Sequence, residues 1–212
     1  MREVILGARS VEVLAMDDLR EAKVALRERV RATVREVTPE RWAEASSAVC
    51  ARILELTEYR LARVVMLYHP TQRELSLRGV AEACLRTGRT VCLPRANWIT
   101  GQLQPARLCA WGEGLSEPVR GIREPLPAAA AVAPSRIDLV VVPGVAFDAC
   151  GGRLGRGSGF YDRFLAGAGG CMRGYKVGVC LDEQVVESVP MGAADTRLDA
   201  VVTPTRVLVR QG

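Results

Sequence analysis

A short, wholly apolar segment followed by a glycine-rich loop constrains the fold of this chain more than any other feature. Residues 139–142 read Leu-Val-Val-Val, and the apolar run stops at Pro143-Gly144. A run of this kind, bounded by turn residues, is typical of a strand buried on both faces of a parallel sheet. The loop that follows has glycine at positions 151, 152, 155, 157 and 159. A helical segment then starts at Phe160, so the sequence predicts the strand–loop–helix unit of an α/β fold.

The rest of the chain alternates predicted helices with predicted strands. Helices are expected over residues 17–35, 39–56 and 77–86, and from Phe160 onward. Strands are expected over residues 63–68, 90–93, 137–142, 176–181 and 199–202, with short strands and a mobile segment in 97–136. Apolar strands that alternate with helices favour a three-layer α/β/α sandwich with a mostly parallel sheet. The sequence contains no internal repeat or linker, so we expect a single domain over residues 1–212.

The glycine-rich loop has the chemistry of a phosphate-binding site. Glycine lets the backbone approach a ligand closely, and successive N–H groups in such a turn form an anion-binding nest. Arg153 and Arg156 add forked donors that suit phosphate oxygens, and Asp162 at the far edge suits a metal ion. Glycine-rich turns without a ligand are also common. The interpretation as a phosphate site therefore rests on the combination of the strand, the glycines, the two arginines and Tyr161-Asp162. The loop lacks both the Lys-Ser/Thr ending of a P-loop and the spacing of a dinucleotide-binding fingerprint.

Beyond this chemistry, the loop resembles the signature of the 5-formyltetrahydrofolate cyclo-ligase family, also known as 5,10-methenyltetrahydrofolate synthetases. The resemblance rests first on residues 143–148 (PGVAFD) and 152–162 (GRLGRGSGFYD). Weaker matches follow in the family's order at residues 23–27, 74, 93–95, 121–125, 184, 190, 195 and 201–203. Together they cover about residues 20–205, which leaves residues 1–20 as an N-terminal extension of unknown role.

The resemblance implies an ATP- and Mg²⁺-dependent enzyme that converts 5-formyltetrahydrofolate to 5,10-methenyltetrahydrofolate and releases ADP and phosphate. A formamide oxygen is a poor leaving group, so ATP would phosphorylate it, and the second folate nitrogen would then displace phosphate. The implied fold is like that of the sugar-phosphate isomerases and CoA transferases. The alternative is a divergent nucleotide-binding paralogue that acts on another substrate or lacks cyclo-ligase activity.

The same resemblance assigns roles to individual residues. The implied ATP-binding residues are Lys23, Arg27, Arg153, Leu154, Gly155, Arg156, Gly157, Ser158, Gly159, Phe160 and Tyr161. The implied substrate-binding residues are Glu74, His69, Arg156 and Phe160. Arg153 and Arg156 are the implied catalytic residues, because they would stabilise charge on the moving phosphoryl group. Asp162 and Asp195 are the implied Mg²⁺ ligands, although Gly192 and Ala194 replace an acid and a histidine that many relatives carry.

Several of these residues also have a plainer interpretation. Without the resemblance, Lys23 and Arg27 would be read as part of a solvated helix face. Asp162 would be read as a helix-start acid and Asp195 as a turn acid. Glu74 would be a solvent-facing acid that precedes a helix.

The composition argues against several other classes of protein. The net charge of +5 comes almost wholly from scattered arginines, and no aromatic-rich RNA-binding motif occurs, so we expect no nucleic-acid partner. No apolar stretch reaches the roughly 18 residues of a membrane span, and the N-terminus has no secretory apolar core, so a cytoplasmic protein is expected. One histidine and seven cysteines without a C-x-x-C pair argue against histidine triads and zinc sites. The expected partners are ATP and a reduced folate, with or without a polyglutamate tail, and we expect a monomer.

Overall fold

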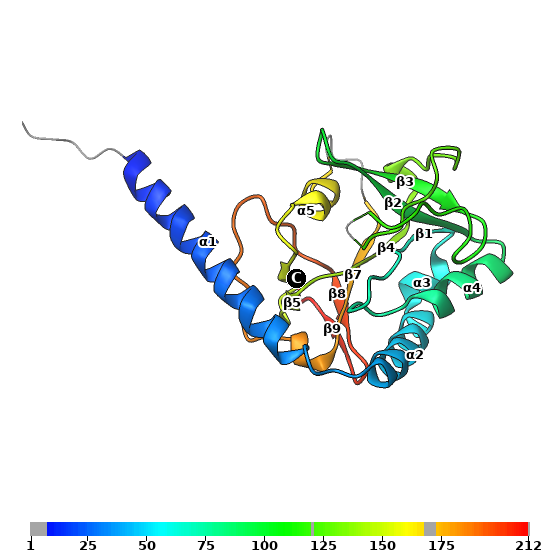
Figure 1. Ribbon diagram of the computed structural model, residues 1–212, viewed down its shortest axis with the longest axis horizontal. Helices are drawn as coiled ribbons and strands as arrows, with labels where there is room; N and C mark the ends of the chain where they lie inside the picture. The colour runs from blue at the N-terminus through cyan, green and yellow to red at the C-terminus, as the bar shows by residue number, and fades with distance from the viewer. Residues whose placement is uncertain (1–7, 120, 168–172, 212) are drawn as a thin grey trace, which may run out of the picture.

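A seven-stranded sheet forms the centre of the molecule in the computed structural model, which describes residues 8–119, 121–167 and 173–211 (Figure 1). The strands lie in the order β3-β2-β1-β4-β7-β8-β9. Their bounds are β1 Val64–Met66, β2 Thr90–Asn97, β3 Gln102–Leu108, β4 Leu139–Val142, β7 Tyr175–Val179, β8 Ala200–Val202 and β9 Val207–Val209. The inner strands run parallel, and the edge strands β3 and β9 are antiparallel to their neighbours. The prediction of a mostly parallel sheet is confirmed.

Helices α2, α3 and α4 cover one face of the sheet. They span Pro39–Glu55, Thr57–Leu61 and Arg78–Arg86. α2 begins where the side chain of Thr38 accepts a hydrogen bond from the N–H of Arg41 (3.3 Å), with Pro39 at the first helical position, where its missing N–H removes no hydrogen bond. Ile53 of α2 is fully buried in the same core as Val65 of β1. Apolar side chains of the helices and the strands therefore form one core on this face.

A small hairpin and a short helix cover the opposite face. The hairpin pairs β5 Ala146–Phe147 with β6 Arg153–Leu154, and α5 spans Phe160–Leu165. The ring of Phe147 is fully buried, and a Cβ at Gly178 of β7 would lie only 2.5 Å from it. The hairpin therefore sits directly on the sheet. The predicted layers are present, with the hairpin forming part of the third layer.

The first helix packs on this hairpin. α1 spans Ala8–Thr33 and runs along one side of the molecule, with its N-terminal turns extending beyond the other elements (Figure 1). Leu26 and Val30 of α1 are buried in a small core that includes Leu154 of β6. This contact holds the helix beside the glycine-rich loop. No helix in residues 8–119, 121–167 and 173–211 is long and apolar enough to cross a membrane. Residues 1–7 of the predicted N-terminal extension lie outside the described residues.

The structure departs from the sequence prediction where elements carry little apolar pattern. α1 begins at Ala8 rather than at residue 17, and β2 continues to Asn97 rather than ending at residue 93. Of the short strands expected inside 97–136, the structure has β3 as a named strand among the described residues. β9, the β5–β6 hairpin and α3 were not predicted, because such short elements show no periodicity. Short 3₁₀ helices occupy Pro134–Arg136 and Asp182–Gln184.

Candidate active site

The glycine-rich loop is held in shape by the buried carboxylate of Asp148. Its Oδ1 accepts hydrogen bonds from the backbone N–H groups of Cys150 (2.9 Å) and Gly152 (2.8 Å), and its Oδ2 accepts one from Val189 (2.8 Å). The residue is only 3% exposed. A Cβ at position 152 would lie 2.3 Å from Oδ2, so only glycine allows the backbone so close to this carboxylate. The start of the loop is therefore fixed by charge-assisted hydrogen bonds.

Arg153 extends from β6 into the space between the loop and α5. Its guanidinium donates to Oδ1 of Asp162 (2.7 Å) and to the carbonyl of Pro143 (3.2 Å), and it lies over the ring of Tyr161 (5.6 Å to the centroid). The side chain is 3% exposed, and its Nε is buried without a hydrogen-bond partner among the described residues. Because buried N–H groups are seldom left unpaired, this donor is a natural contact for a ligand oxygen.

Arg156 connects the loop to the segment after β1. Its Nη2 lies 2.8 Å from Oε1 of Glu74 and 2.7 Å from Oγ1 of Thr71. The other oxygen of Glu74 accepts from the backbone N–H (2.9 Å) and the hydroxyl (3.0 Å) of Thr71. The side chain of Glu74 is 12% exposed, whereas that of Arg156 is 47% exposed. Glu74 is therefore held by its own turn, and Arg156 is the more exposed partner of this pair.

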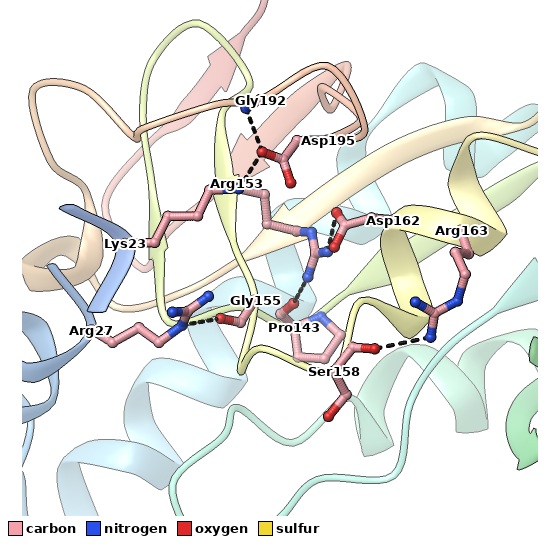
Figure 2. A network of polar contacts seen from close by, with 10 residues as sticks. All are labelled: Lys23, Arg27, Pro143, Arg153, Gly155, Ser158, Asp162, Arg163, Gly192 and Asp195. Carbon is pink, nitrogen blue, oxygen red and sulfur yellow. Dashed lines mark hydrogen bonds and ion pairs between the residues drawn. The ribbon is translucent and has the colours of Figure 1, made fainter. Parts of the chain in front are cut away.

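Lys23 and Arg27 reach the loop from α1 (Figure 2). The ammonium of Lys23 pairs with Oδ2 of Asp195, which also accepts from the backbone N–H of Gly192 (2.6 Å). Arg27 donates through Nε to the carbonyl of Gly155 (2.9 Å). A Cβ at position 192 would lie 2.8 Å from a side-chain atom of Leu19, so glycine here lets α1 approach the segment that carries the acid.

The candidate acids are each paired with a candidate cation. Glu74 pairs with Arg156, Asp162 with Arg153, and Asp195 with Lys23. Arg27 forms no ion pair with a carboxylate of the described residues. Burial and the charge of Arg31 lower the pKa of Arg27, while the acids nearby raise it by less. Arg27 therefore contributes a positive charge beside the loop that no acid of the described chain neutralises at contact distance.

A cavity of about 890 Å³, part of it open to solvent, lies between the loop, α5 and the first strands. The predicted site residues that line it are His69, Glu74, Arg153, Gly155, Arg156, Ser158, Gly159, Phe160, Tyr161 and Asp162. Burial raises the pKa of the Tyr161 hydroxyl, so this group remains a hydrogen-bond donor at neutral pH. His69 stacks on Trp111 (5.4 Å between ring centroids), and burial lowers its pKa. His69 is therefore a neutral cavity-lining group in this arrangement.

Other predicted site residues do not line the cavity. Lys23, Arg27 and Asp195 lie at the α1 side of the loop, and Gly157 faces the guanidinium of Arg27, which would lie 4.0 Å from a Cβ there. Leu154 is 1% exposed, and its side chain belongs to the core beneath α1. Its carbonyl also accepts a hydrogen bond from Val145 N–H (2.7 Å) in the hairpin. The structure thus gives the Leu154 side chain a packing role.

One wall of the cavity was not predicted from the sequence. Residues from the β2–β3 hairpin and from the segment before β4 line it: Pro94, Ala96, Trp98, Leu103, Ile122, Arg123 and Glu124. The rings of Trp98 and Phe160 meet edge to face, 4.9 Å between centroids. The carboxylate of Glu124 accepts from Ala96 N–H (3.1 Å), and burial raises its pKa. The sequence did contain a signal for the part of this wall that follows β2, because residues that follow a parallel strand lie at the sheet edge where ligands bind.

Asp162 and Asp195 each have a carboxylate oxygen that could bind a divalent cation. Each uses a single oxygen, Oδ1 of Asp162 and Oδ2 of Asp195, for its contacts with other described residues. The second oxygen of each remains available. Among the described residues no cluster of three or more His, Cys, Asp or Glu side chains could enclose a metal. This donor set fits Mg²⁺, which commonly takes one or two carboxylates together with water and substrate phosphates.

Comparison with known proteins gives a consistent picture. Residues 19–204 match the 5-formyltetrahydrofolate cyclo-ligase family. The 5-formyltetrahydrofolate cyclo-ligase of Escherichia coli (strain K12) is 32% identical over 188 residues, covering 84% of this chain and 98% of the relative. A probable 5-formyltetrahydrofolate cyclo-ligase of Schizosaccharomyces pombe is 30% identical over 175 residues, covering 77% and 85%. The NMR structure of Aquifex aeolicus 5,10-methenyltetrahydrofolate synthetase superposes with a TM-score of 0.77 at 32% identity, covering 90% of this chain and 94% of that one.

Proposed function

Because the chain belongs to the 5-formyltetrahydrofolate cyclo-ligase family, we propose that it converts 5-formyltetrahydrofolate to 5,10-methenyltetrahydrofolate with ATP and Mg²⁺, and that it releases ADP and phosphate. The observation that carries the proposal is the convergence of Arg153, Arg156 and Glu74 on one cavity beside the glycine-rich loop. A folate and a nucleotide phosphate must meet there for the reaction to occur. The family membership agrees with the resemblance seen in the sequence.

In this proposal Arg153 and Arg156 act on the phosphoryl group during its transfer. ATP phosphorylates the formyl oxygen, the second folate nitrogen attacks the formyl carbon, and the carbon–oxygen bond breaks with loss of phosphate. Such a transfer requires alignment and positive charge more than covalent chemistry. Arg153 offers its unpaired Nε from a buried position, and Arg156 offers an exposed guanidinium at the cavity. Arg156 also contacts Glu74, which would bind the folate ring system through hydrogen bonds.

The remaining predicted residues divide between the substrates. Lys23, Arg27 and the loop from Gly155 to Tyr161 would bind ATP, while His69 and Phe160 would contact the folate. Asp162 and Asp195 would hold Mg²⁺ through their available oxygens, and the ion would neutralise phosphate charge when bound. Each acid holds a cationic side chain in place as well, so it would serve both the ion and the position of Arg153 or Lys23.

Replacing Lys23 with glutamine is expected to raise the KM for ATP by about 10-fold, which corresponds to about 1.4 kcal/mol of binding free energy. The substitution removes the ammonium beside the loop and leaves Asp195 without its cation. The KM for 5-formyltetrahydrofolate should change little, because Lys23 does not line the cavity. Steady-state kinetics with each substrate varied in turn measures both values. Arg20→Gln, an exposed arginine on the same helix, is the matched control, and an equal effect in both variants would contradict the assignment.

The proposed function is tested by incubating the purified protein with 5-formyltetrahydrofolate, Mg²⁺ and ATP and following methenyltetrahydrofolate absorbance. Product that depends on ATP supports cyclo-ligase activity. Omission of Mg²⁺ tests the metal separately. If no product forms while ATP still raises the melting temperature of the protein, the chain is instead a nucleotide-binding paralogue with another substrate.

A further inference from the structure

The cavity has walls from two different parts of the chain, and Arg163 connects them. One wall is the β2–β3 hairpin, whose turn begins at Trp98, and the other is the glycine-rich loop with α5. The guanidinium of Arg163 donates through Nε to the carbonyl of Gly101 (2.8 Å) in the hairpin turn. Through Nη2 it donates to the carbonyl of Ser158 (2.9 Å) in the loop (Figure 2). One side chain thus binds a backbone carbonyl from each wall.

Glycine residues make room for this guanidinium on either side. A Cβ at Gly101 would lie 2.6 Å from Nη2, and a Cβ at Gly159 would lie 2.8 Å from Nη1 of Arg163. Both distances are shorter than side chains tolerate, so a larger residue at either position would displace the guanidinium. The hairpin and the loop therefore both fit the shape of the Arg163 side chain.

The aromatic contact across the cavity involves the same side chain. The guanidinium of Arg163 lies over the ring of Phe160 (5.5 Å to the centroid). The Phe160 ring also forms a T-shaped contact with the ring of Trp98 (4.9 Å between centroids, 79° between planes). The hairpin turn has its own local support, since Oδ1 of Asn97 accepts from the N–H groups of the next turn residues (3.0 and 3.1 Å). The turn is shaped locally, and the contacts of Arg163 and of the Trp98–Phe160 ring pair join it to the loop and α5.

We propose, on the basis of the proposed cyclo-ligase function, that Arg163 is a positioning residue that sets the distance between the β2–β3 hairpin and the glycine-rich loop. It touches neither reacting group. It holds the wall that contacts the folate at a fixed position relative to the loop that contacts the phosphates. Misplacement of reacting groups by about 1 Å can reduce a rate by about 100-fold, so release of this wall acts mainly on kcat.

The first experiment compares Arg163→Met, Arg163→Lys and the parent protein. Methionine keeps an unbranched side chain over Phe160 but removes every donor, and we expect kcat to fall by about 10- to 100-fold. The Kd of ATP measured without folate should rise far less than kcat falls, because Asp148 anchors the start of the loop independently and Arg163 donates to one loop carbonyl, that of Ser158. Lysine can reach only one carbonyl at a time and should restore part of the rate. Arg86→Met, an exposed arginine of α4, is the matched control.

Hydrogen exchange supplies a measurement that does not require activity. In Arg163→Met the amides of residues 98–103 should exchange about 10-fold faster than in the parent, because the turn is released from α5. Gly101→Ala breaks the same contact from the hairpin side and should have the same effects. Gly112→Ala is its control, since Gly112 also has positive φ (+83°) but a Cβ there would meet nothing within 4 Å. In the double variant the two losses of kcat should not add.

Several results would overturn the positioning role. One is a kcat and an exchange rate in Arg163→Met that match those of Arg86→Met. Another is a parallel fall of kcat, ATP affinity and melting temperature, which would show that Arg163 merely stabilises the fold. If the parent protein itself forms no methenyltetrahydrofolate, the proposed function fails, and exchange at residues 98–103 alone decides whether Arg163 holds the hairpin.

Discussion

Replacing Arg156 with alanine is expected to lower kcat for methenyltetrahydrofolate formation by about 10²- to 10³-fold, the usual cost of removing a donor that stabilises transition-state charge. The melting temperature should change little, because the Arg156 side chain is 47% exposed and leaves no buried void. Glu74 keeps its hydrogen bonds from Thr71, so the acid remains in place without its arginine. Steady-state kinetics and a thermal melt of the same preparation separate the two effects.

Arg73→Ala is the matched control for this prediction. Arg73 is an exposed arginine in the same segment as Glu74 but does not line the cavity. Its loss changes the net charge equally, so any general electrostatic effect on ATP should appear in both variants. A kcat for Arg156→Ala within about 3-fold of the Arg73→Ala value would refute a direct role of Arg156 in phosphoryl transfer.

Replacing Asp148 with asparagine should have the largest effect on stability, about 3 kcal/mol at this buried site. The carboxylate accepts from Cys150 and Gly152 on Oδ1 and from Val189 on Oδ2. Asparagine has one acceptor oxygen. Its NH₂ group, itself a donor, must therefore face either the N–H groups of Cys150 and Gly152 or the N–H group of Val189. For a chain of this size the melting temperature should fall by about 6–12 °C. Denaturant and thermal unfolding both measure the change.

Asp138→Asn provides the comparison, because Asp138 uses its carboxylate differently. It is exposed, and its Oδ2 alone accepts from the N–H groups of Arg63 and Val64 (2.8 Å each). An amide oxygen can take that place, so this variant should remain close to the parent in stability. Equal destabilisation of both variants would mean that loss of charge, rather than reversal of a hydrogen-bond donor and acceptor, explains the result at Asp148.

The sequence predicted those parts of the molecule that are determined by residues close together in the chain. The β4–loop–α5 unit combines an apolar run, glycines and arginines within residues 139–165, and it has the predicted order in the structure. Asp148 was recognised only as part of a motif, because nothing in its neighbours reveals that Val189 donates to it. Leu154 was included in the ATP site by its place in the motif, although alternation along β6 turns its side chain into the core.

The wall formed by Trp98 and Glu124 was missed because its place beside the loop depends on topology rather than on a local sequence pattern. Trp98 follows a strand that runs four residues beyond its apolar section, and β3 carries Pro105 and polar residues typical of an edge strand. The pairing of each candidate acid with a candidate cation was also beyond the sequence. Residue types indicated charges that bind ligands, but only the fold shows that Asp162 contacts Arg153.

The pair between Lys23 and Asp195 joins residues that are 172 positions apart. During synthesis on the ribosome the lysine is made first, and at about 5–20 residues per second its acid follows roughly 10–30 s later. Throughout that interval the nascent chain carries Lys23 without Asp195, so the α1 side of the proposed nucleotide site is incomplete. Binding of ATP at the proposed site could therefore not draw on this pair during early folding, and truncated translation products that end before residue 195 should be unable to assemble this side of the proposed site.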